Sequence, residues 1–329
     1  MTATAVAAAP SQTTARALAF VAAHRAHAEQ LGRALADHAG DPPSFAAALR
    51  AGLASLADPE YLAGQRRVAP GIGSLHGVRS PLLASLARAL RAETRHDPAM
   101  PLLDVAQRLL REPELEAHWL AFGILERTIT REPERTWQLL RGAAARAGDW
   151  ITVDTLARPY GRGILGEAFR WAELEQLVYS PSRRERRLVG STIATIPHLD
   201  RQAGRSPGTV RHGLELVGQL IGDDEPDVRK ALSWALRTLA ALDGPATAAF
   251  LTAETDEAAR TADGHRAWVI RDSLSRLAPP VAAELRYRLD GIRVRTGAPA
   301  TSRAFRTRAA FAGLGLDVPP AERPTVSRP

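Results

Sequence analysis

Residues suited to an ionic ligand fall in three short segments of the sequence. The first holds Trp150 and Asp154, which are four residues apart and would project from one face of a helix. The second, 182–187, contains four arginines, and the third, 227–237, contains a lysine, a tryptophan and two arginines. Guanidinium groups bind phosphate in a bidentate geometry. A carboxylate beside electron-rich rings can instead stabilise a developing cation.

The spacing of these segments predicts that they share one surface. Trp150 lies 37 residues before Arg187, and Arg187 lies 47 residues before Trp234. In a helical repeat protein, residues one repeat apart on equivalent helices are neighbours. Taken singly, each feature has an ordinary structural explanation, because a lone tryptophan is commonly a core residue, as we expect for Trp119 and Trp137. Likewise, a lone aspartate commonly caps a helix, and a run of arginines is commonly a solvated helix start. Because the three segments are spaced by about one repeat, we favour the interpretation that they form one surface. That surface would carry two tryptophans, one carboxylate and several cations.

The elements that must position these residues are predicted to be helices. Apolar residues recur at i, i+3, i+4 and i+7 in stretches such as PLLASLARALRAE, and strand signals are nearly absent. Short breaks between the stretches contain proline, glycine or aspartate. Proline suits the first turn of a helix, so these breaks predict helix starts. They occur at Asp97-Pro98, Glu112-Pro113, Glu132-Pro133, Ser180-Pro181, Glu225-Pro226 and Asp243-Gly244-Pro245.

The predicted helices come in pairs at a spacing of roughly 40 residues, the period of HEAT-like and armadillo-like repeats. We therefore predict an all-α fold, a HEAT-like or armadillo-like α-solenoid of antiparallel helix pairs with a concave basic face. The repeat domain is expected to span 12–296, after a disordered leader at 1–11. From Gly297 the periodicity is lost, so 297–329 is expected to be a basic and mostly disordered tail.

Composition narrows the classes of partner and cofactor. The 329 residues carry a formal net charge of +7 and the sequence pI is about 10.7, which favours an anionic partner. Lys230 is the only lysine, so the other 42 of the 43 basic residues are arginines. The absence of cysteine excludes disulfides, iron–sulfur clusters and thiolate zinc sites, and it fits a reducing cytoplasm. Because no apolar run approaches roughly 18 residues and no basic region precedes the first apolar stretch, neither a membrane span nor a secretory signal is expected.

Two other patterns resemble sites but do not predict one. The stretch Gly161-Arg-Gly163-Ile-Leu-Gly166 matches a dinucleotide fingerprint, with Glu185 about where the ribose acid should lie. The residues before it cannot form a buried strand, so we interpret it as a glycine-rich turn between helices. His24 and His27 lie about one helical turn apart but lack a third ligand, so no metal is assigned. Walker loops, nucleophile elbows and Cys/His pairs are absent from the sequence.

At the three segments the sequence resembles the DNA alkylation repair proteins of the AlkD type, which are HEAT-like-repeat alkylpurine DNA glycosylases. The W-x-x-V-D segment of that family matches Trp150-Ile-Thr-Val-Asp154, and Arg187 matches an arginine that opens the helix of the next repeat. The K-A-x-x-W-x-L-R helix matches Lys230-Ala-Leu-Ser-Trp234-Ala-Leu-Arg237. An upstream G-[IV]-x-x-P stretch matches Gly77-Val78-Arg79-Ser80-Pro81. The resemblance covers about residues 60 to 290, in matching order and spacing.

The resemblance implies a concave cleft that holds duplex DNA. It implies that Asp154, Trp150 and Trp234 are the catalytic residues and meet the deoxyribose of the lesion, while arginine holds the phosphate backbone. One departure from the family is Asp149, where an aromatic residue often precedes the first tryptophan. An acid at this position could repel phosphate or change the choice of lesion. The DNA-binding residues expected on this basis are Arg187, Arg183, Arg184, Lys230, Arg237 and Arg79.

The activity expected from the sequence is that of a monofunctional DNA glycosylase. It would release positively charged N3- and N7-alkylated purines from duplex DNA, without a cofactor or metal. The protein is expected to be a monomer of the bacterial cytoplasm, associated with the nucleoid when bound to DNA. One alternative is a non-catalytic HEAT-repeat scaffold that binds nucleic acid, and another is an adaptor whose basic face meets an acidic protein. Salt-sensitive duplex binding separates the two alternatives, and base release from methylated DNA separates both from the enzyme.

Overall fold

The computed structural model describes residues 11–313, which form sixteen α-helices, three short 3-10 helices and no β-strand. The all-α fold predicted from the sequence is therefore confirmed. The chain divides into two compact units, Met1–Gly166 and Glu167–Pro329, and each is described by itself. Within the described range, no helix has the length and apolar character needed to cross a membrane.

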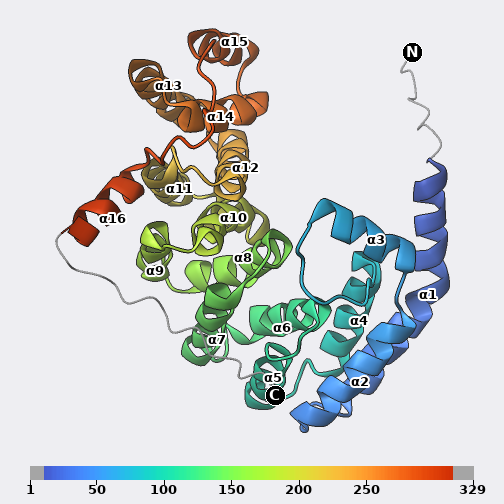
Figure 1. The fold of residues 1–329 in the computed structure, drawn as a ribbon. Helices are drawn as coiled ribbons and strands as arrows, with labels where there is room; N and C mark the ends of the chain where they lie inside the picture. Colours follow the sequence, from blue (N-terminus) through green and yellow to red (C-terminus); the bar gives the residue numbers. More distant parts are fainter. Residues whose placement is uncertain (1–10, 314–329) are drawn as a thin grey trace, which may run out of the picture. The chain divides into compact units, whose positions relative to one another are not determined.

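The first unit contains the first eight helices (Figure 1). In it α1 packs along α4, and α6 packs on both α5 and α8. The periodic leucines Leu82, Leu86 and Leu90 of α4 are buried, as helical spacing predicts. The bounds are α1 (Gln12–Ala36), α2 (Pro42–Ser55), α3 (Pro59–Val68), α4 (Ser80–Glu93), α5 (Ala99–Leu109), α6 (Leu115–Thr128), α7 (Pro133–Arg146) and α8 (Trp150–Gly166).

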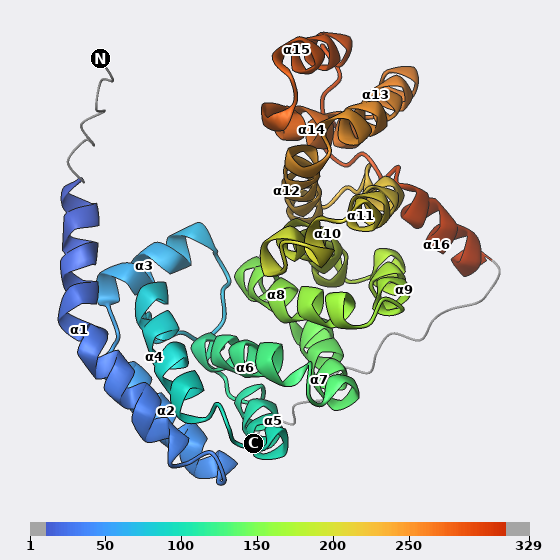
Figure 2. The same ribbon diagram turned by 180° about the vertical axis from the view of Figure 1, so that it is seen from behind.

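The second unit contains the remaining helices. Figure 2 shows α10, α12 and α14 in succession, with α11 and α13 beside them and α16 against α11. The most extensive packing in this unit is between α10 and α12. The α-helix bounds are α9 (Arg170–Gln176), α10 (Arg183–Leu199), α11 (Pro207–Leu220), α12 (Pro226–Leu242), α13 (Gly244–Thr261), α14 (Gly264–Ser273), α15 (Pro279–Arg288) and α16 (Arg303–Gly313). The 3-10 helices are η1 (Leu177–Tyr179), η2 (Ala203–Arg205) and η3 (Leu274–Arg276).

The predicted repeat period and helix starts agree with the structure. Helices α6, α8, α10, α12 and α14 begin at residues 115, 150, 183, 226 and 264, so successive starts are 33 to 43 residues apart. Three of the predicted proline starts, Pro133, Pro226 and Pro245, lie in the first turn of a helix. At the other three breaks the helix begins one or two residues after the proline.

Two local predictions are wrong. The glycine-rich stretch 161–166 is the end of α8 rather than a turn, because the buried Tyr160 and Ile164 give it an apolar helical face. Of the two tryptophans expected in the core, Trp137 is buried, with 1% of its surface exposed, but Trp119 is only half-buried. The Trp119 indole donates a hydrogen bond to the hydroxyl of the buried Thr152, so the polar edge of the ring contacts α8 while part of the ring stays exposed.

The prediction of a disordered tail from Gly297 is wrong for α16. This helix packs on α11 and η1, and Ala300 and Ser302 before it and Ala304 within it are buried. The helix has few large apolar residues, so its sequence pattern is weak and its order depends on tertiary contacts. Residues 1–10 of the predicted leader and 314–329 of the predicted tail lie outside the described residues. The single repeat domain expected at 12–296 stays a prediction.

Candidate functional site

Trp150 and Asp154 lie one turn apart at the start of α8, in the first unit. Both side chains are half-buried. The helix start is fixed by Asp149, whose carboxylate accepts hydrogen bonds from the Thr152 amide and the Thr152 hydroxyl, each at 2.8 Å. This N-cap determines which residues begin the helix. It therefore also sets the directions in which Trp150 and Asp154 project.

The acid that replaces an aromatic residue of the family pattern is buried. Only 6% of Asp149 is exposed, and its partner Thr152 also accepts a hydrogen bond from Trp119 Nε1 at 3.3 Å. The network joins the start of α8 to α6. An acid at this position thus stabilises the helix start, and the repulsion of phosphate considered from the sequence does not follow from its surroundings.

The arginines that open α10, in the second unit, contact the start of α12. Arg183 is exposed and pairs with Glu225 at 3.2 Å. Arg184 donates to the Asp227 carboxylate at 2.6 Å, and Arg187 donates to the Asp227 backbone carbonyl, also at 2.6 Å. Arg187 itself is buried, with 5% exposed. Three of the predicted DNA-binding arginines thus join one helix to the next.

Helix α12 presents Lys230, Trp234 and Arg237 at intervals of three to four residues, so they lie along one side of the helix. Trp234 is half-buried and Lys230 is exposed. Arg237 donates to the Asp272 carboxylate at 2.7 Å, which links α12 to the end of α14. The Lys230 ammonium forms no hydrogen bond or ion pair within residues 11–313, so its charge is available to an external anion.

Arg79 precedes α4 in the first unit and is held by a carboxylate and two rings. Its Nε donates to Asp58 at 2.6 Å, and its guanidinium lies 5.2 Å from the Tyr61 ring centroid and 5.8 Å from that of Phe20. Burial by itself would raise the pKa of Asp58, but the hydrogen bonds from Arg79 and from backbone amides lower it overall. This predicted DNA-binding residue is therefore part of a folded junction.

The motif of residues 77–81, which contains Arg79, begins with a buried turn. Glu116 of α6, 1% exposed, accepts hydrogen bonds from the Gly77 amide at 2.8 Å and the Val78 amide at 3.2 Å. Gly77 has φ +85°, and a Cβ there would lie 2.7 Å from the Leu62 Cβ. Both the backbone conformation and the close approach require glycine.

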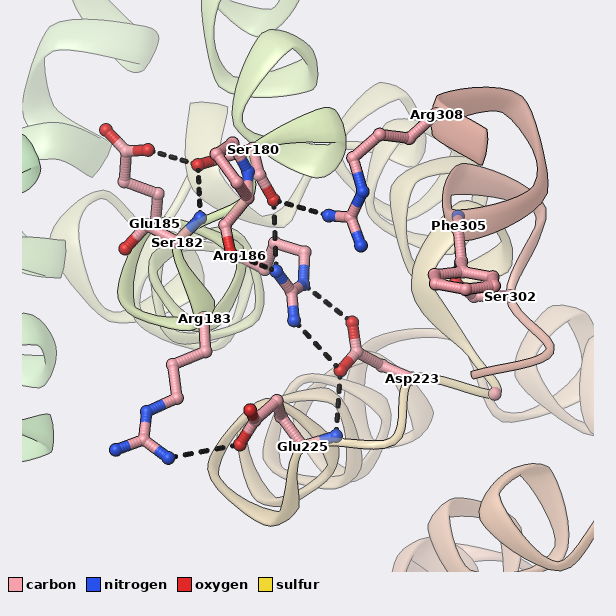
Figure 3. Close-up of polar contacts among 12 residues, drawn as sticks. Ser180, Ser182, Arg183, Glu185, Arg186, Asp223, Glu225, Ser302, Phe305 and Arg308 are labelled. Carbon is pink, nitrogen blue, oxygen red and sulfur yellow. Dashed lines mark hydrogen bonds and ion pairs between the residues drawn. The ribbon is translucent and has the colours of Figure 1, made fainter. Parts of the chain in front are cut away.

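A buried network that the sequence did not single out lies at the start of α10 (Figure 3). Arg186 is 5% exposed, and its Nε donates to Asp223 at 2.7 Å while its Nη1 donates to the Ser180 carbonyl at 3.0 Å. Arg308 of α16 donates to the same carbonyl at 2.9 Å. In the sequence, Asp223 lies about one repeat after Arg186. That spacing alone does not predict that the two side chains form an ion pair.

A similar contact joins α12 to α14. Arg229 is 7% exposed, and its Nη1 lies 2.9 Å from His265 Nδ1, while its guanidinium lies 5.5 Å from the Trp268 ring centroid. Burial lowers the pKa of Arg229, and nearby acids partly offset that effect. These contacts hold α10, α12 and α14 in register.

The structure thus places the predicted residues in two groups. Trp150 and Asp154 share α8 in the first unit, whereas Arg187, Lys230 and Trp234 occupy the packed pair α10 and α12 in the second. The single surface predicted for both groups stays a prediction. Within the described part of the chain, no three His, Asp or Glu side chains are arranged to hold a metal ion.

The structure has helix pairs of this period, a helix that carries Trp150 and Asp154, and arginine-rich helix starts. These features define the chain as a helical repeat protein. Residues 49–267, about two-thirds of its length, match the family model described as DNA alkylation repair enzyme. The chain belongs to the DNA alkylation repair enzyme family, and all the predicted site residues lie within the match. Its family gives it a role in the repair of alkylated DNA, with DNA as substrate. No curated protein matches the chain.

Proposed function

We propose that this protein is a monofunctional DNA glycosylase that releases positively charged N3- and N7-alkylated purines from duplex DNA. The observation that carries the proposal is the Trp150–Asp154 pair on α8, whose helix start is fixed by the buried Asp149 cap. The family supports repair of alkylated DNA, and hydrolysis of the N-glycosidic bond is the repair step that such a pair suits.

The chemistry requires little from the protein beyond electrostatics. An alkylated purine already carries positive charge, so the bond from its nitrogen to C1′ can break without a general acid, and the base leaves neutral. The sugar becomes an oxocarbenium-like cation. The Asp154 carboxylate stabilises this cation and orients a water for attack on C1′, and the proton released by the water passes to Asp154 or to solvent.

The tryptophans and cations serve binding in this mechanism. The half-buried rings of Trp150 and Trp234 each offer an electron-rich surface to the cationic sugar. Arg187 and the exposed Lys230 bind phosphate, which positions the duplex without reading its sequence. Side chains of the chain itself fill both roles.

The proposal includes the absence of strand cleavage. Lyase activity needs an amine nucleophile, normally a lysine that desolvation makes reactive as a free amine. Lys230 is the only lysine and its side chain is exposed, so it is expected to remain a solvated ammonium that contacts phosphate. Borohydride trapping of a covalent adduct between Lys230 and DNA would contradict this part of the proposal.

The direct test is incubation of the protein with a methylated duplex, followed by chromatography for free alkylated base and by gel analysis of the strand. We expect free N3- or N7-methylpurine and an intact strand until the abasic site is cleaved by alkali. Salt-sensitive duplex binding without release of any base would instead support the non-catalytic scaffold.

A further inference from the structure

The positive charge of the chain is concentrated near its C-terminus. Residues 286–308, the C-terminal basic segment, contain seven arginines and one aspartate, a net charge of +6. The whole chain carries +7, which leaves +1 for all other residues together. The family match ends at residue 267, so this segment lies outside it. The net charge of the chain favours an anionic partner, and most of that net charge comes from these residues.

The segment is attached to the second unit by hydrogen bonds that leave most of its arginines unused. His265 Nε2 lies 3.0 Å from the Ala298 carbonyl, and the Thr301 amide donates to the Gly222 carbonyl at 2.8 Å. Further along, Arg308 donates to the carbonyl that ends η1, as Figure 3 shows. These contacts reach the loops before α10 and α12 and the first turn of α14, so the segment is an ordered part of the unit.

Arg293 is exposed and pairs with Asp290, whereas four other exposed arginines of the segment do not pair: Arg286, Arg295, Arg303 and Arg306. Their side chains form no hydrogen bond or ion pair with the rest of residues 11–313. Arg303 and Arg306 are three residues apart on α16 and project from the same side of it, whereas the anchoring Arg308 projects from another. The helix therefore has one arginine that fastens it and two that face solvent.

Arg303 and Arg306 add positive charge near a buried arginine. They lie close enough to the buried Arg266, which pairs with Glu254 and Asp263, to repel it. Burial lowers the pKa of Arg266 to about 10, and the charges of Arg303 and Arg306 contribute to the shift. Repulsion of a buried guanidinium by like charges disfavours the folded state, so the contact with Arg266 does not explain why these two arginines are present.

We propose that the C-terminal basic segment is a second duplex-binding surface, which holds undamaged DNA backbone outside the lesion site. The exposed arginines of the segment outnumber its exposed large apolar side chains, Tyr287 and Val294. Charged residues are depleted in the cores of protein interfaces, so the segment suits phosphates better than a protein partner. The surface would capture DNA electrostatically and retain it while the lesion site searches. This goes beyond the proposed glycosylase activity and rests only on DNA as the partner.

The test compares the variant R303Q/R306Q with the control R25Q/R33Q. Arg25 and Arg33 are exposed arginines on α1 that, like the α16 pair, have no hydrogen bond or ion pair within residues 11–313, so both variants remove the same charge. The measurement is the affinity for an undamaged duplex as a function of salt. Each lost phosphate contact lowers the log–log slope by about 0.9, so R303Q/R306Q is expected to lower it by about 1.8 and the control to leave it unchanged. Adding R286Q and R295Q is expected to lower the slope further.

A slope that falls equally in the α16 variant and the control, or in neither, would overturn the proposal. Loss of binding to an acidic protein with unchanged duplex binding would do the same. A melting temperature equal to that of the wild type shows that the variant is folded. If the wild type releases no base, the glycosylase proposal fails, but the comparison of slopes still tests this surface.

Discussion

Two groups of arginines in this protein differ in what they contact. The paired arginines, Arg79, Arg183, Arg184 and Arg237, were predicted from the sequence to bind DNA, and each is ion-paired with an aspartate or glutamate. Four exposed arginines of the C-terminal basic segment, Arg286, Arg295, Arg303 and Arg306, have no such partners among the described residues. Position in a family motif and availability for phosphate are therefore separate properties.

The difference has energetic consequences. A phosphate that binds a paired arginine must replace a carboxylate already in place. For Arg183, whose side chain is 50% exposed, the ion pair contributes at most about 1 kcal/mol, so exchange is easy. For Arg79 and Arg184, whose side chains are 16% exposed, desolvation makes the carboxylate a stronger competitor. An arginine without a carboxylate partner binds phosphate without breaking an ion pair.

The largest expected effect is on stability, from Arg186→Ala. This substitution leaves the nearly buried Asp223 carboxylate without its main partner, which typically costs about 3–5 kcal/mol. Urea denaturation is expected to show this loss, whereas Arg183→Ala, at an exposed pair one turn earlier, is expected to cost less than about 1 kcal/mol. Equal losses in the two variants would contradict the division of the α10 arginines into buried and exposed.

Arg79→Ala is expected to destabilise the protein by about 2 kcal/mol at neutral pH, because Asp58 loses a hydrogen-bonded cation but keeps its backbone donors. The folded-state pKa of Asp58 is lowered in the wild type, so its contribution is present above the unfolded pKa near 3.9 and is lost as pH falls through the folded pKa. The variant should lose part of this acid-dependent contribution. A reduced salt slope for duplex binding with unchanged stability would show instead that Arg79 binds phosphate.

A smaller effect is expected from Arg187→Ala, which tests whether a buried arginine on α10 also contacts DNA. A single phosphate contact changes the salt slope by about 1, and the loss of affinity should be similar for all duplex sequences. The control is Arg25→Ala, at an exposed arginine of α1 that is not among the predicted DNA-binding residues. An unchanged slope in Arg187→Ala would mean that its hydrogen bond to the Asp227 carbonyl is its main role.

Helical periodicity was sufficient to predict the elements and their period. The starts at Pro133, Pro226 and Pro245 follow from the chemistry of proline, and buried leucines follow from the spacing of apolar residues. The order of α16 could not be predicted, because its contacts are made by Arg308 and by short side chains with residues more than 70 positions away in the sequence.

The candidate site was predictable in part. Trp150 and Asp154 were expected on one helix face because four residues make about one turn, and both lie at the start of α8. The capping role of Asp149 was not expected, since an aspartate before a helix can face solvent, a ligand or the backbone. The partners of the arginines were equally hidden, because ion pairs between repeats depend on how neighbouring helices pack.

The central claim is that Asp154 acts on the sugar of an alkylated nucleotide, and single-turnover excision by Asp154→Asn tests it most directly. We expect excision from methylated duplex to fall tenfold or more, since a lost electrostatic contact to a developing cation costs at least about 1.4 kcal/mol. Duplex affinity should be retained or increased, because a negative charge is removed. The melting temperature serves as the control for folding. Excision per folded molecule equal to that of the wild type would contradict the mechanism.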